Sequence, residues 1–328
     1  MQVGLPHNTA RIRWVLWAIT LLVLIALFFS RHLLCRSWTL AALGGAWPRN
    51  VADFTISDAH DAFDVTFSSY NRTQLTAAPY HDLVPPIIHH IALGQLSSDW
   101  REEWREAAQS CLEWHPGWEA YSWTDESAAK FVAVKFPELE DMWLRYRHPI
   151  QRVDALRYMV LHEYGGVILD MDLKCKRALG PLRRFSFVAP EAHPTGFSIS
   201  FMMASKHNAF VGDIVRNLTT YNKEWLGLPY PTVMFSTGGH FASVIHASES
   251  NRTNLKILPG PLHTLSGRVS TPLFDHLGSS SWHSYDAQLA VKLSSQLNMI
   301  FFFSAMIVVV LCVRGKPIVN RSWCRCMK

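Results

Sequence analysis

Two kinds of hydrophobic pattern occur along the chain. Near each end an apolar run continues for 17 positions without a charged residue, at 14–30 and at 297–313. Between these runs, short apolar segments alternate with longer segments whose apolar residues recur at helical spacing. The first pattern is typical of helices that cross a membrane, and the second is typical of a globular domain that contains both strands and helices.

The alternating pattern of the middle part predicts a series of strands and helices. Strands are expected at 87–93, 118–123, 167–169, 185–189 and 200–204. Helices are expected at 100–115, 127–136, 138–147, 150–164 and 208–222. Gly165 and Gly166 follow the fourth helix and are expected to end it with a left-handed cap. Strands that alternate with helices predict an α/β domain with a largely parallel sheet, whose ligands bind beyond the carboxyl ends of the strands.

The two apolar runs are at the short end of the length that crosses a membrane. The first can also be read as a cleaved signal peptide, but residues 31–38 offer no clear small-residue cleavage site. The second can also be read as a buried helix, although an uncharged run rich in Phe and Val favours a span. Basic residues follow the second run, so the positive-inside rule places the C-terminus in the cytosol. Two spans then put both termini in the cytosol and the middle part in a lumen.

These features divide the chain into six segments. They are a cytosolic tail at 1–13, a transmembrane helix at 14–31, a stem at 32–84, an α/β domain at 85–290, a transmembrane helix at 291–314 and a basic cytosolic tail at 315–328. The stem ends at Pro85 and Pro86. Its first part, Leu33 to Trp47, is apolar and is expected to lie on the membrane surface.

Composition and charge narrow the class of protein. Hydrophobic residues make up 49% of the 328 positions and charged residues 17%, which excludes an intrinsically disordered chain. The net charge is +5, and the tail after the second apolar run, with five basic and no acidic residues, accounts for all of it. The middle part is therefore near neutral, which argues against nucleic acid as a partner.

Cysteines and sequons bear on the compartment. The chain has six cysteines, of which Cys111 and Cys175 lie in the middle part and either pair or remain buried thiols. Three Asn-X-Thr sequons, at Asn71, Asn217 and Asn251, also lie in the middle part. Their position agrees with a lumenal location, although sequons often arise by chance.

The strand expected at 167–169 runs directly into Asp170-Met171-Asp172. Two carboxylates at a strand end can hold a hard divalent cation, which in turn binds a diphosphate. Two classes of protein fit this pattern. One is the haloacid-dehalogenase type of phosphatase, but Lys174 stands where its motif has Thr or Val, and the turn lies in the middle of the domain. The other is the class of nucleotide-sugar transferases.

The helix before the strand carries Asp154, Arg157 and Tyr158, which share one helical face at i, i+3 and i+4. Two readings are open for this group. Asp154 and Arg157 either form an exposed ion pair of small energetic value or line the cleft that contains the Asp-Met-Asp turn. In the second reading Asp154 accepts hydrogen bonds from sugar hydroxyls, and Arg157 donates to phosphate or sugar.

The central block resembles glycosyltransferase family 32, a sugar-transferase family with a DXD motif. The residues that carry the resemblance are Gln151 to Tyr158, Leu161, Tyr164 to Gly166 and Leu169 to Asp172. Outer segments are similar to the fungal mannosyl phosphorylinositol ceramide synthase branch. They are Pro85 to His90, Trp114 to Glu119, Trp123 to Asp125, Cys175 to Leu182, Tyr230 to Gly238, Gly278 to His283, and Asp286-Ala287. The resemblance covers about residues 85 to 290, and the two flanking spans also resemble that branch.

This resemblance implies a GT-A-like nucleotide-sugar-binding domain and a retaining transfer of mannose from GDP-mannose to inositol phosphorylceramide in the Golgi membrane. Asp170 and Asp172 match the motif that binds Mn²⁺ (or Mg²⁺) and the diphosphate, so they are candidate catalytic residues together with Arg157. Asp154, Arg157 and Tyr158 match the donor-binding residues. His283 matches a late histidine that completes the metal shell, with His276 as the alternative. Trp282 either packs over the donor or belongs to the core.

The sequence also departs from the family at several positions. Ala92 stands where many members have Trp or Thr, Gly196 to Ser200 lack an expected Asn, and His240 follows Gly239 where relatives often have Pro. These differences affect the expected donor-base and acceptor contacts but not the metal turn. Two other functions remain open: a glycoprotein mannosyltransferase of the same fold, and a catalytically silent membrane subunit that binds a partner synthase. The need for a regulatory membrane subunit is likewise open.

Overall fold

The structure is a computed structural model that describes residues 14–22, 25, 35–94, 101–225 and 227–278. Residues 14–22 form a helix within the first apolar run. In these described ranges no helix is both long enough and apolar enough to cross a membrane. The second apolar run, at 297–313, lies outside the described residues, as do Trp282 and His283.

A six-stranded sheet forms the centre of the domain, in the order β2-β1-β3-β6-β5-β7. Its strands are β1 (Ile87–Ile91), β2 (Glu119–Trp123), β3 (Gly166–Leu169), β5 (Phe187–Pro190), β6 (Phe201–Ala204) and β7 (Leu255–Leu258). Strand β1 is parallel to β2 and β3, and β5 is parallel to β7, whereas β6 is antiparallel to both β3 and β5. The sheet is therefore mixed, because the link at 191–200 is shorter than the dozen or so residues that a parallel crossover needs.

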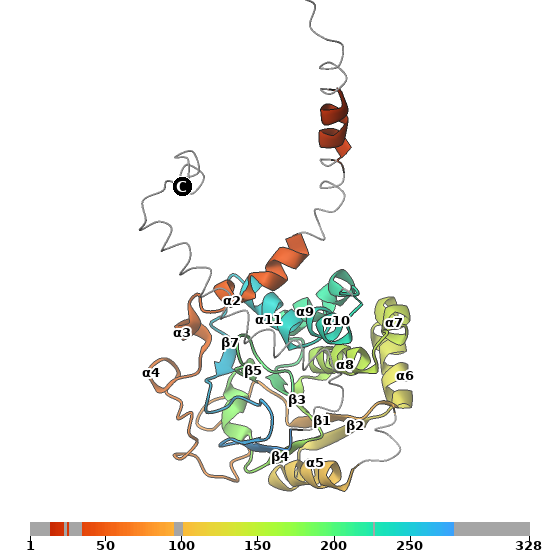
Figure 1. Cartoon of the computed structure of the whole chain (residues 1–328). Helices are drawn as coiled ribbons and strands as arrows, with labels where there is room; N and C mark the ends of the chain where they lie inside the picture. The colour runs from red at the N-terminus through yellow and green to blue at the C-terminus, as the bar shows by residue number, and fades with distance from the viewer. Residues whose placement is uncertain (1–13, 23–24, 26–34, 95–100, 226, 279–328) are drawn as a thin grey trace, which may run out of the picture.

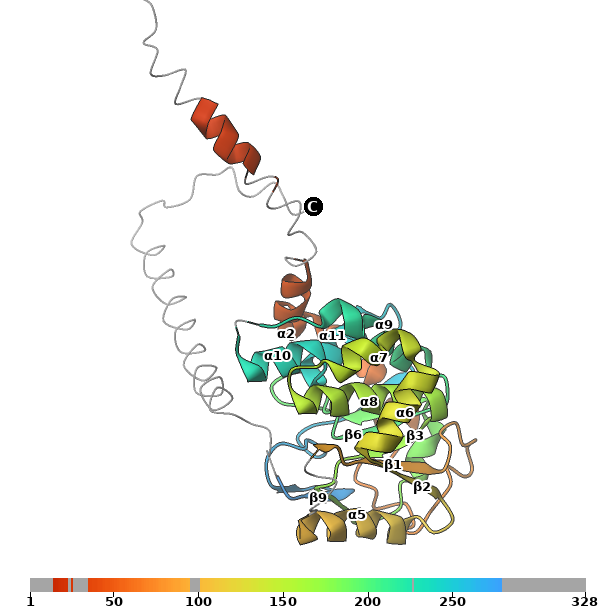
Figure 2. The same ribbon diagram turned by 90° about the vertical axis from the view of Figure 1, so that its right-hand side faces the viewer.

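Helices cover one face of this sheet, and a helix with a small second sheet covers the other (Figures 1 and 2). The first face carries α6 (Asp125–Lys135), α7 (Pro137–Leu144), α8 (Pro149–Tyr164), α9 (Ala209–Tyr221), α10 (Pro229–Ser236) and α11 (Gly239–Ser248). The other face carries α5 (Glu102–Trp114), the short 3₁₀ helix η2 (Gly180–Arg184) and the three-stranded sheet of β4 (Leu173–Cys175), β9 (Phe274–His276) and β8 (Val269–Ser270). The helices and strands expected from the sequence are present with small shifts at their ends, and this confirms an α/β architecture.

The two faces of the sheet contribute to two separate hydrophobic clusters. Ile168 of β3 packs toward α8 and α9, while its neighbours Val167 and Leu169 pack on the opposite side. This division follows from the alternation of side chains along a strand. All four residues of β3 are buried, so a strand sandwiched between two layers leads directly to the Asp-Met-Asp turn.

The segment at 35–84, for which the sequence suggests a stem, packs closely on the rest of the domain. It contains α2 (Leu43–Ala46), α3 (Val51–Phe54) and α4 (Asp58–Asp61). Leu43 and Trp47 are buried in the first cluster, and Phe63 and Phe67 in the second. Leu43 and Trp47 therefore do not face a membrane surface. The segment contributes to the same core as the sheet, and no change in packing marks a boundary at residue 84.

Gly165 and Gly166 follow α8. Their lack of a side chain lets the backbone pass close to strand β1 and to the segment after β6. Gly165 has φ 69° and ψ −162°, which is a backbone conformation open to glycine but is not the left-handed helical cap that the sequence suggested. A Cβ atom at Gly165 would lie 2.6 Å from the Lys206 nitrogen, and one at Gly166 would lie 2.6 Å from the Ile87 carbonyl oxygen. The pair thus lets α8 turn directly into a strand that pairs with β1.

Candidate active site

The Asp-Met-Asp turn begins where the central strand ends. Strand β3 stops at Leu169, and the amide of Asp170 donates to the Ser200 carbonyl at 2.9 Å. The chain then reverses, because the Leu173 amide donates to the Asp170 carbonyl at 3.1 Å. The expected location at the carboxyl end of a buried strand is confirmed, but the two aspartates lie in a turn rather than in an extended segment.

Arg157 of α8 links the helix to this turn. One terminal nitrogen, Nη1, donates to Asp154 Oδ1 at 2.7 Å, and the other, Nη2, donates to Asp170 Oδ1. The side chains of Arg157 and Asp154 are only 9% and 3% exposed. The pair is therefore not an exposed ion pair. The structure supports the reading in which this face of α8 lies against the Asp-Met-Asp turn.

A threonine that the sequence did not single out completes the environment of Asp154. Thr237, in the turn between α10 and α11, donates from Oγ1 to Asp154 Oδ2 at 3.1 Å. The Tyr158 hydroxyl donates to the carbonyl of the same threonine at 2.7 Å. Tyr158 is fully buried and holds the turn that carries Thr237, so its part in the site is indirect. Both oxygens of the Asp154 carboxylate therefore accept a hydrogen bond, one from Arg157 and the other from Thr237.

Burial controls the electrostatics of these groups. It raises the pKa of the Asp154 carboxyl to about 7, although the Arg157 charge and the Thr237 hydrogen bond act in the opposite direction. It also raises the pKa of Asp170, again against the effect of Arg157. Burial alone would lower the pKa of Arg157, but the two carboxylates outweigh it and the pKa is raised. Arg157 therefore stays charged between its two acidic neighbours.

A histidine from the small sheet reaches the second aspartate. Strand β9 pairs with β4 in a register that places His276 opposite Leu173, and His276 Nε2 lies 3.3 Å from Asp172 Oδ2. The backbone is fixed there too, because the Leu277 amide donates to the Asp172 carbonyl at 3.0 Å. Burial alone would lower the pKa of His276, but the hydrogen bond to Asp172 and the charge of that carboxylate outweigh it and raise the pKa. The alternative to His283 thus lies at the site.

The side chains at the Asp-Met-Asp turn decide whether a divalent cation fits there. Asp154, Asp170 and Asp172 outnumber the guanidinium of Arg157, so the site carries an excess of carboxylate oxygen. Carboxylate oxygen is the donor that Mn²⁺ and Mg²⁺ prefer. No group of three or more His, Cys, Asp or Glu arranged to hold a metal ion occurs within the described part of the chain. Asp170 and Asp172 therefore suit such an ion, and the described residues do not complete its shell.

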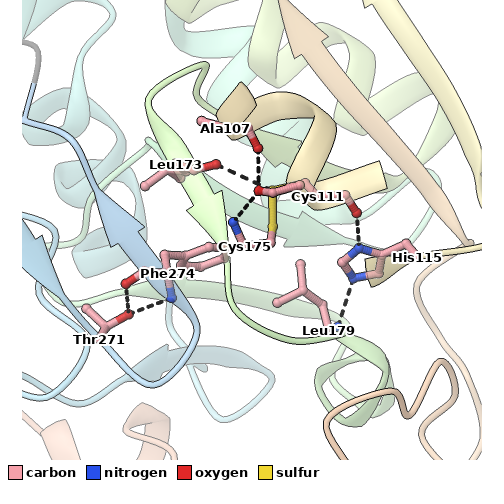
Figure 3. Close-up of a disulfide and its surroundings, with 9 residues drawn as sticks. Ala107, Cys111, His115, Leu173, Cys175, Leu179, Thr271 and Phe274 are labelled. Carbon is pink, nitrogen blue, oxygen red and sulfur yellow. Dashed lines mark hydrogen bonds between the residues drawn. A yellow bond between two sulfur atoms is a disulfide. The ribbon is translucent and has the colours of Figure 1, made fainter. Parts of the chain in front are cut away.

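The turn is braced from the other face of the sheet. Met171, between the two aspartates, packs with Trp104 and Ala108 of α5. A disulfide joins Cys111 of α5 to Cys175, three positions after Asp172 (Figure 3). Of the two possibilities left open by the sequence, the structure thus has the paired one. The sequence left the pairing of these cysteines open, because nothing in it indicates that α5 lies beside β4.

His115 forms a second link between α5 and the segment after the Asp-Met-Asp turn (Figure 3). Its Nε2 accepts a hydrogen bond from the Leu179 amide at 2.9 Å, so the ring proton resides on Nδ1, which donates to the Cys111 carbonyl at 2.6 Å. Burial lowers the pKa of His115 to about 4, which keeps the ring neutral at physiological pH. Helix α5 and the chain after the Asp-Met-Asp turn are therefore joined by both covalent and hydrogen bonds.

The central part of the chain matches the model of a known family. Residues 101–188 match the family described as "Glycosyltransferase sugar-binding region containing DXD motif". The matched residues include Asp154, Arg157 and the DXD motif Asp170-Met171-Asp172, which are the residues that the structure brings together.

Curated relatives extend the match beyond the central part. The mannosyl phosphorylinositol ceramide synthases SUR1 and CSH1 of Saccharomyces cerevisiae are 34% and 30% identical over 67% and 70% of this chain. The chain spans 57% and 60% of the length of these two relatives. Inositol phosphoceramide mannosyltransferase 1 of Schizosaccharomyces pombe is 29% identical over 76% of this chain and 79% of its own length. Among solved structures, the PaToxG glycosyltransferase matches with a TM-score of 0.41 and 16% identity over 67% of this chain and 80% of that chain.

Proposed function

We propose that this protein is a retaining mannosyltransferase with a GT-A-like domain, and that it moves mannose from GDP-mannose to the inositol of inositol phosphorylceramide. One observation carries the proposal: Arg157 is held between Asp154 and Asp170, at a DXD turn that follows a buried strand. The curated relatives named as mannosyl phosphorylinositol ceramide synthases support mannose as the transferred sugar and inositol phosphorylceramide as the acceptor.

In this proposal Asp170 and Asp172 hold Mn²⁺ or Mg²⁺, and either His276 or His283 adds a third ligand. Of these two, His276 lies among the described residues, where its Nε2 is 3.3 Å from Asp172 Oδ2, and binding a cation would require it to exchange this contact for the ion. When bound, such an ion neutralises negative charge that develops on a diphosphate. The excess of carboxylate over guanidinium at the turn supports this assignment.

The protein side chains have separate parts in the proposed transfer. Arg157 donates to the diphosphate of the donor and stabilises the charge of the departing GDP. Asp154 accepts hydrogen bonds from mannose hydroxyls and orients the sugar. Asp154, Asp170 and Asp172 are each paired with Arg157 or His276, so none of them is assigned as a nucleophile. The inositol hydroxyl attacks the front face of the sugar, and its proton passes to the leaving phosphate.

The location proposed for this reaction is the lumenal side of the Golgi membrane. Two spans at the apolar runs would hold the domain beside the bilayer, with both termini in the cytosol. The disulfide between Cys111 and Cys175 supports a lumenal domain, because disulfides persist in oxidising compartments. A lipid acceptor gives such an anchored domain a physical reason, since its headgroup stands at the membrane surface.

The test is an assay of the purified full-length protein with GDP-mannose, Mn²⁺ and inositol phosphorylceramide. Transfer is expected, chelation with EDTA should abolish it, and added Mn²⁺ should restore it. Asp172→Ala should reduce transfer by at least about 100-fold while the protein remains folded, because a group that stabilises developing charge is lost. Full transfer by folded Asp172→Ala would refute the metal assignment.

Two further outcomes would identify the other functions. Transfer to glycoprotein glycans, without transfer to the lipid, would indicate a glycoprotein mannosyltransferase. The absence of both turnover and GDP-Mn²⁺ binding would indicate a silent subunit that serves a partner synthase.

A further inference from the structure

Of the three Asn-X-Thr sequons, two share a local structure that the third lacks. In Asn71-Arg72-Thr73, Asn71 Oδ1 accepts from the Thr73 amide at 3.1 Å and from the Thr73 hydroxyl at 3.0 Å. In Asn251-Arg252-Thr253, Asn251 Oδ1 accepts the corresponding bonds at 3.0 and 2.8 Å. All four Asn and Thr residues are exposed. The asparagine and the threonine hydroxyl are therefore already paired at the surface.

The central arginine explains why the flanking residues face solvent. Arg252 is buried, with its guanidinium carbon 4.3 Å from the centre of the Phe54 ring and its Nη1 donating to the Trp47 carbonyl at 3.3 Å. Arg72 donates from Nη2 to the Lys176 carbonyl at 2.8 Å. Each arginine thus anchors its tripeptide to the body of the domain. Because neighbouring side chains in a non-helical segment point in different directions, Asn and Thr on either side are directed outward.

The third sequon is built into a helix. Asn217, Leu218 and Thr219 lie within α9, where Leu218 is fully buried and Asn217 is half-buried. Residues at i and i+2 of a helix do not face each other, so the Thr219 hydroxyl cannot meet the Asn217 amide. The amide nitrogen Nδ2 of Asn217 already donates to the Asp213 carbonyl at 2.9 Å. Asn217 therefore cannot pair with the threonine of its sequon as Asn71 and Asn251 do, and its side-chain nitrogen is already held by a hydrogen bond.

A polar cavity of about 220 Å³ adjoins one of the exposed sequons. It is lined by Asn251 and Thr253 from the loop after α11, and by Arg49, Asn50 and Asp53 from the N-terminal segment. The cavity lies away from Asp170 and Asp172, so it is not part of the candidate active site. Its amide, carboxylate and guanidinium groups are the kind that bond sugar hydroxyls, and a sugar attached at Asn251 would lie beside them.

We propose that Asn71 and Asn251 carry N-linked glycans and that Asn217 does not. In the reaction, Nδ2 forms a bond to C1 of an oligosaccharide and gives up one proton, while the bond from C1 to a lipid diphosphate breaks and the diphosphate leaves. The donor is a lipid-diphosphate-linked oligosaccharide, and the catalyst is the oligosaccharyltransferase of the secretory pathway. This proposal rests on the proposed lumenal location and is independent of the proposed mannosyl transfer.

The experiment follows the electrophoretic mobility of the full-length chain from a eukaryotic host, before and after treatment with peptide N-glycosidase F. The glycosidase should increase the mobility of wild-type protein by an amount that corresponds to two glycans, and the loss of one glycan is called one step. Asn71→Gln and Asn251→Gln should each remove one step, and the double variant should remove both. Asn217→Gln is the matched control and should leave both steps in place.

Threonine variants test whether the oligosaccharyltransferase recognises each sequon while the asparagine itself is left unchanged. Thr73→Ala and Thr253→Ala should each lose one step, whereas Thr73→Ser and Thr253→Ser should retain it. A wild-type chain with no shift, or a step that disappears in Asn217→Gln, would overturn the proposal. Because mobility is read on the denatured chain, a variant that folds poorly still gives an answer. A chain that transfers mannose but lacks glycans would refute this proposal alone.

Discussion

At the scale of single residues, one guanidinium decides the arrangement of the candidate site. Arg157 spans the gap between α8 and the Asp-Met-Asp turn by contacting one carboxylate on each. A planar fork with several donors suits this position, since it can serve two carboxylates at once. The same feature makes the site sensitive to substitution, because the buried Asp154 and the partly buried Asp170 are both paired with that one cation.

Arg157→Ala should therefore affect both folding and catalysis. Loss of the cation leaves Asp154 and Asp170 without their shared partner, which should lower the free energy of unfolding by about 3–5 kcal/mol. Mannosyl transfer should fall by at least about 100-fold. Urea unfolding and the transfer assay measure the two effects. Arg157→Lys keeps the charge without the fork, and recovery of full activity in that variant would contradict the bridging role.

Thr237→Val should test the orientation of Asp154 with little change in shape. The hydroxyl donates to a buried carboxylate, so its loss should lower kcat/KM for donor transfer by roughly 10-fold. Tyr158 bonds the Thr237 backbone carbonyl, and that contact survives the substitution. Thr237→Ser should restore most of the activity, and Thr219→Val on the exposed side of α9 is a matched control. Full activity in Thr237→Val, which keeps the methyl group and lacks the hydroxyl, would contradict the role of the hydrogen bond to Asp154.

At the scale of secondary-structure elements, the Asp-Met-Asp turn depends on two elements that lie on opposite faces of the sheet. Helix α8 contacts it through Arg157, and α5 braces the chain beyond it through Met171 and the disulfide. Strand β9 adds His276 by pairing with β4. A displacement of either α5 or β9 would therefore move Asp172 without changing any residue of the turn.

Removal of the disulfide by Cys111→Ser with Cys175→Ser should destabilise the protein. The crosslink joins residues with a sequence separation of 64, and the chain-entropy relation gives about 4 kcal/mol for a loop of that size. The melting temperature should fall, and transfer should fall with it, because β4 follows directly on Asp172. Reduction with dithiothreitol should reproduce both effects. Cys35→Ser, which removes an exposed free thiol, serves as the control and should change neither.

At the scale of the whole molecule, the domain has a hydrophobic core on each side of one mixed sheet. Residues 35–84 contribute side chains to both cores. Several histidines are buried within these cores with their rings neutral. His89 shows why: Nε2 contacts the Gly165 carbonyl at 2.9 Å, and Nδ1 accepts from the Trp123 indole at 3.2 Å. Protonation of Nδ1 would turn this acceptor into a donor facing another donor.

The stability of the whole domain should therefore decrease in acid. Burial lowers the pKa of His89, His90, His115 and His246 to about 4, against 6.5 in the unfolded chain. Between these values the unfolded state binds more protons, so stability is complete above about pH 6.5 and is lost as the pH falls toward 4.

The raised pKa values of the Asp154, Asp170 and Glu249 carboxyls and of His276 act in the opposite direction. The histidines with lowered pKa values outnumber these groups, because His162, His240 and His263 add to the four above. The urea midpoint should therefore be lower at pH 5 than at pH 7. An equal or higher midpoint at pH 5 would contradict this assignment.

Much of the architecture was predictable because its signals are local. The apolar segment at 167–169 is bounded by a glycine pair and an acidic turn, and the structure has a buried strand there. Asp154 and Arg157 share a face because of helical spacing alone, and the structure joins them to Asp170. The close packing of residues 35–84 was not predictable, because an apolar segment next to an expected span can equally well face lipid or core.

The sequence by itself determined most of the strands and helices between residues 87 and 222, the carboxylates at a strand end and the face of α8 that carries their partner. These properties follow from periodicities of two and 3.6 residues, which act within one element. Only the tertiary structure decided that Thr237 meets Asp154, 83 positions away, that His276 meets Asp172, and that Cys111 pairs with Cys175. Such contacts depend on which strands pair and on which helices cover which face, and no local pattern of residues encodes that choice.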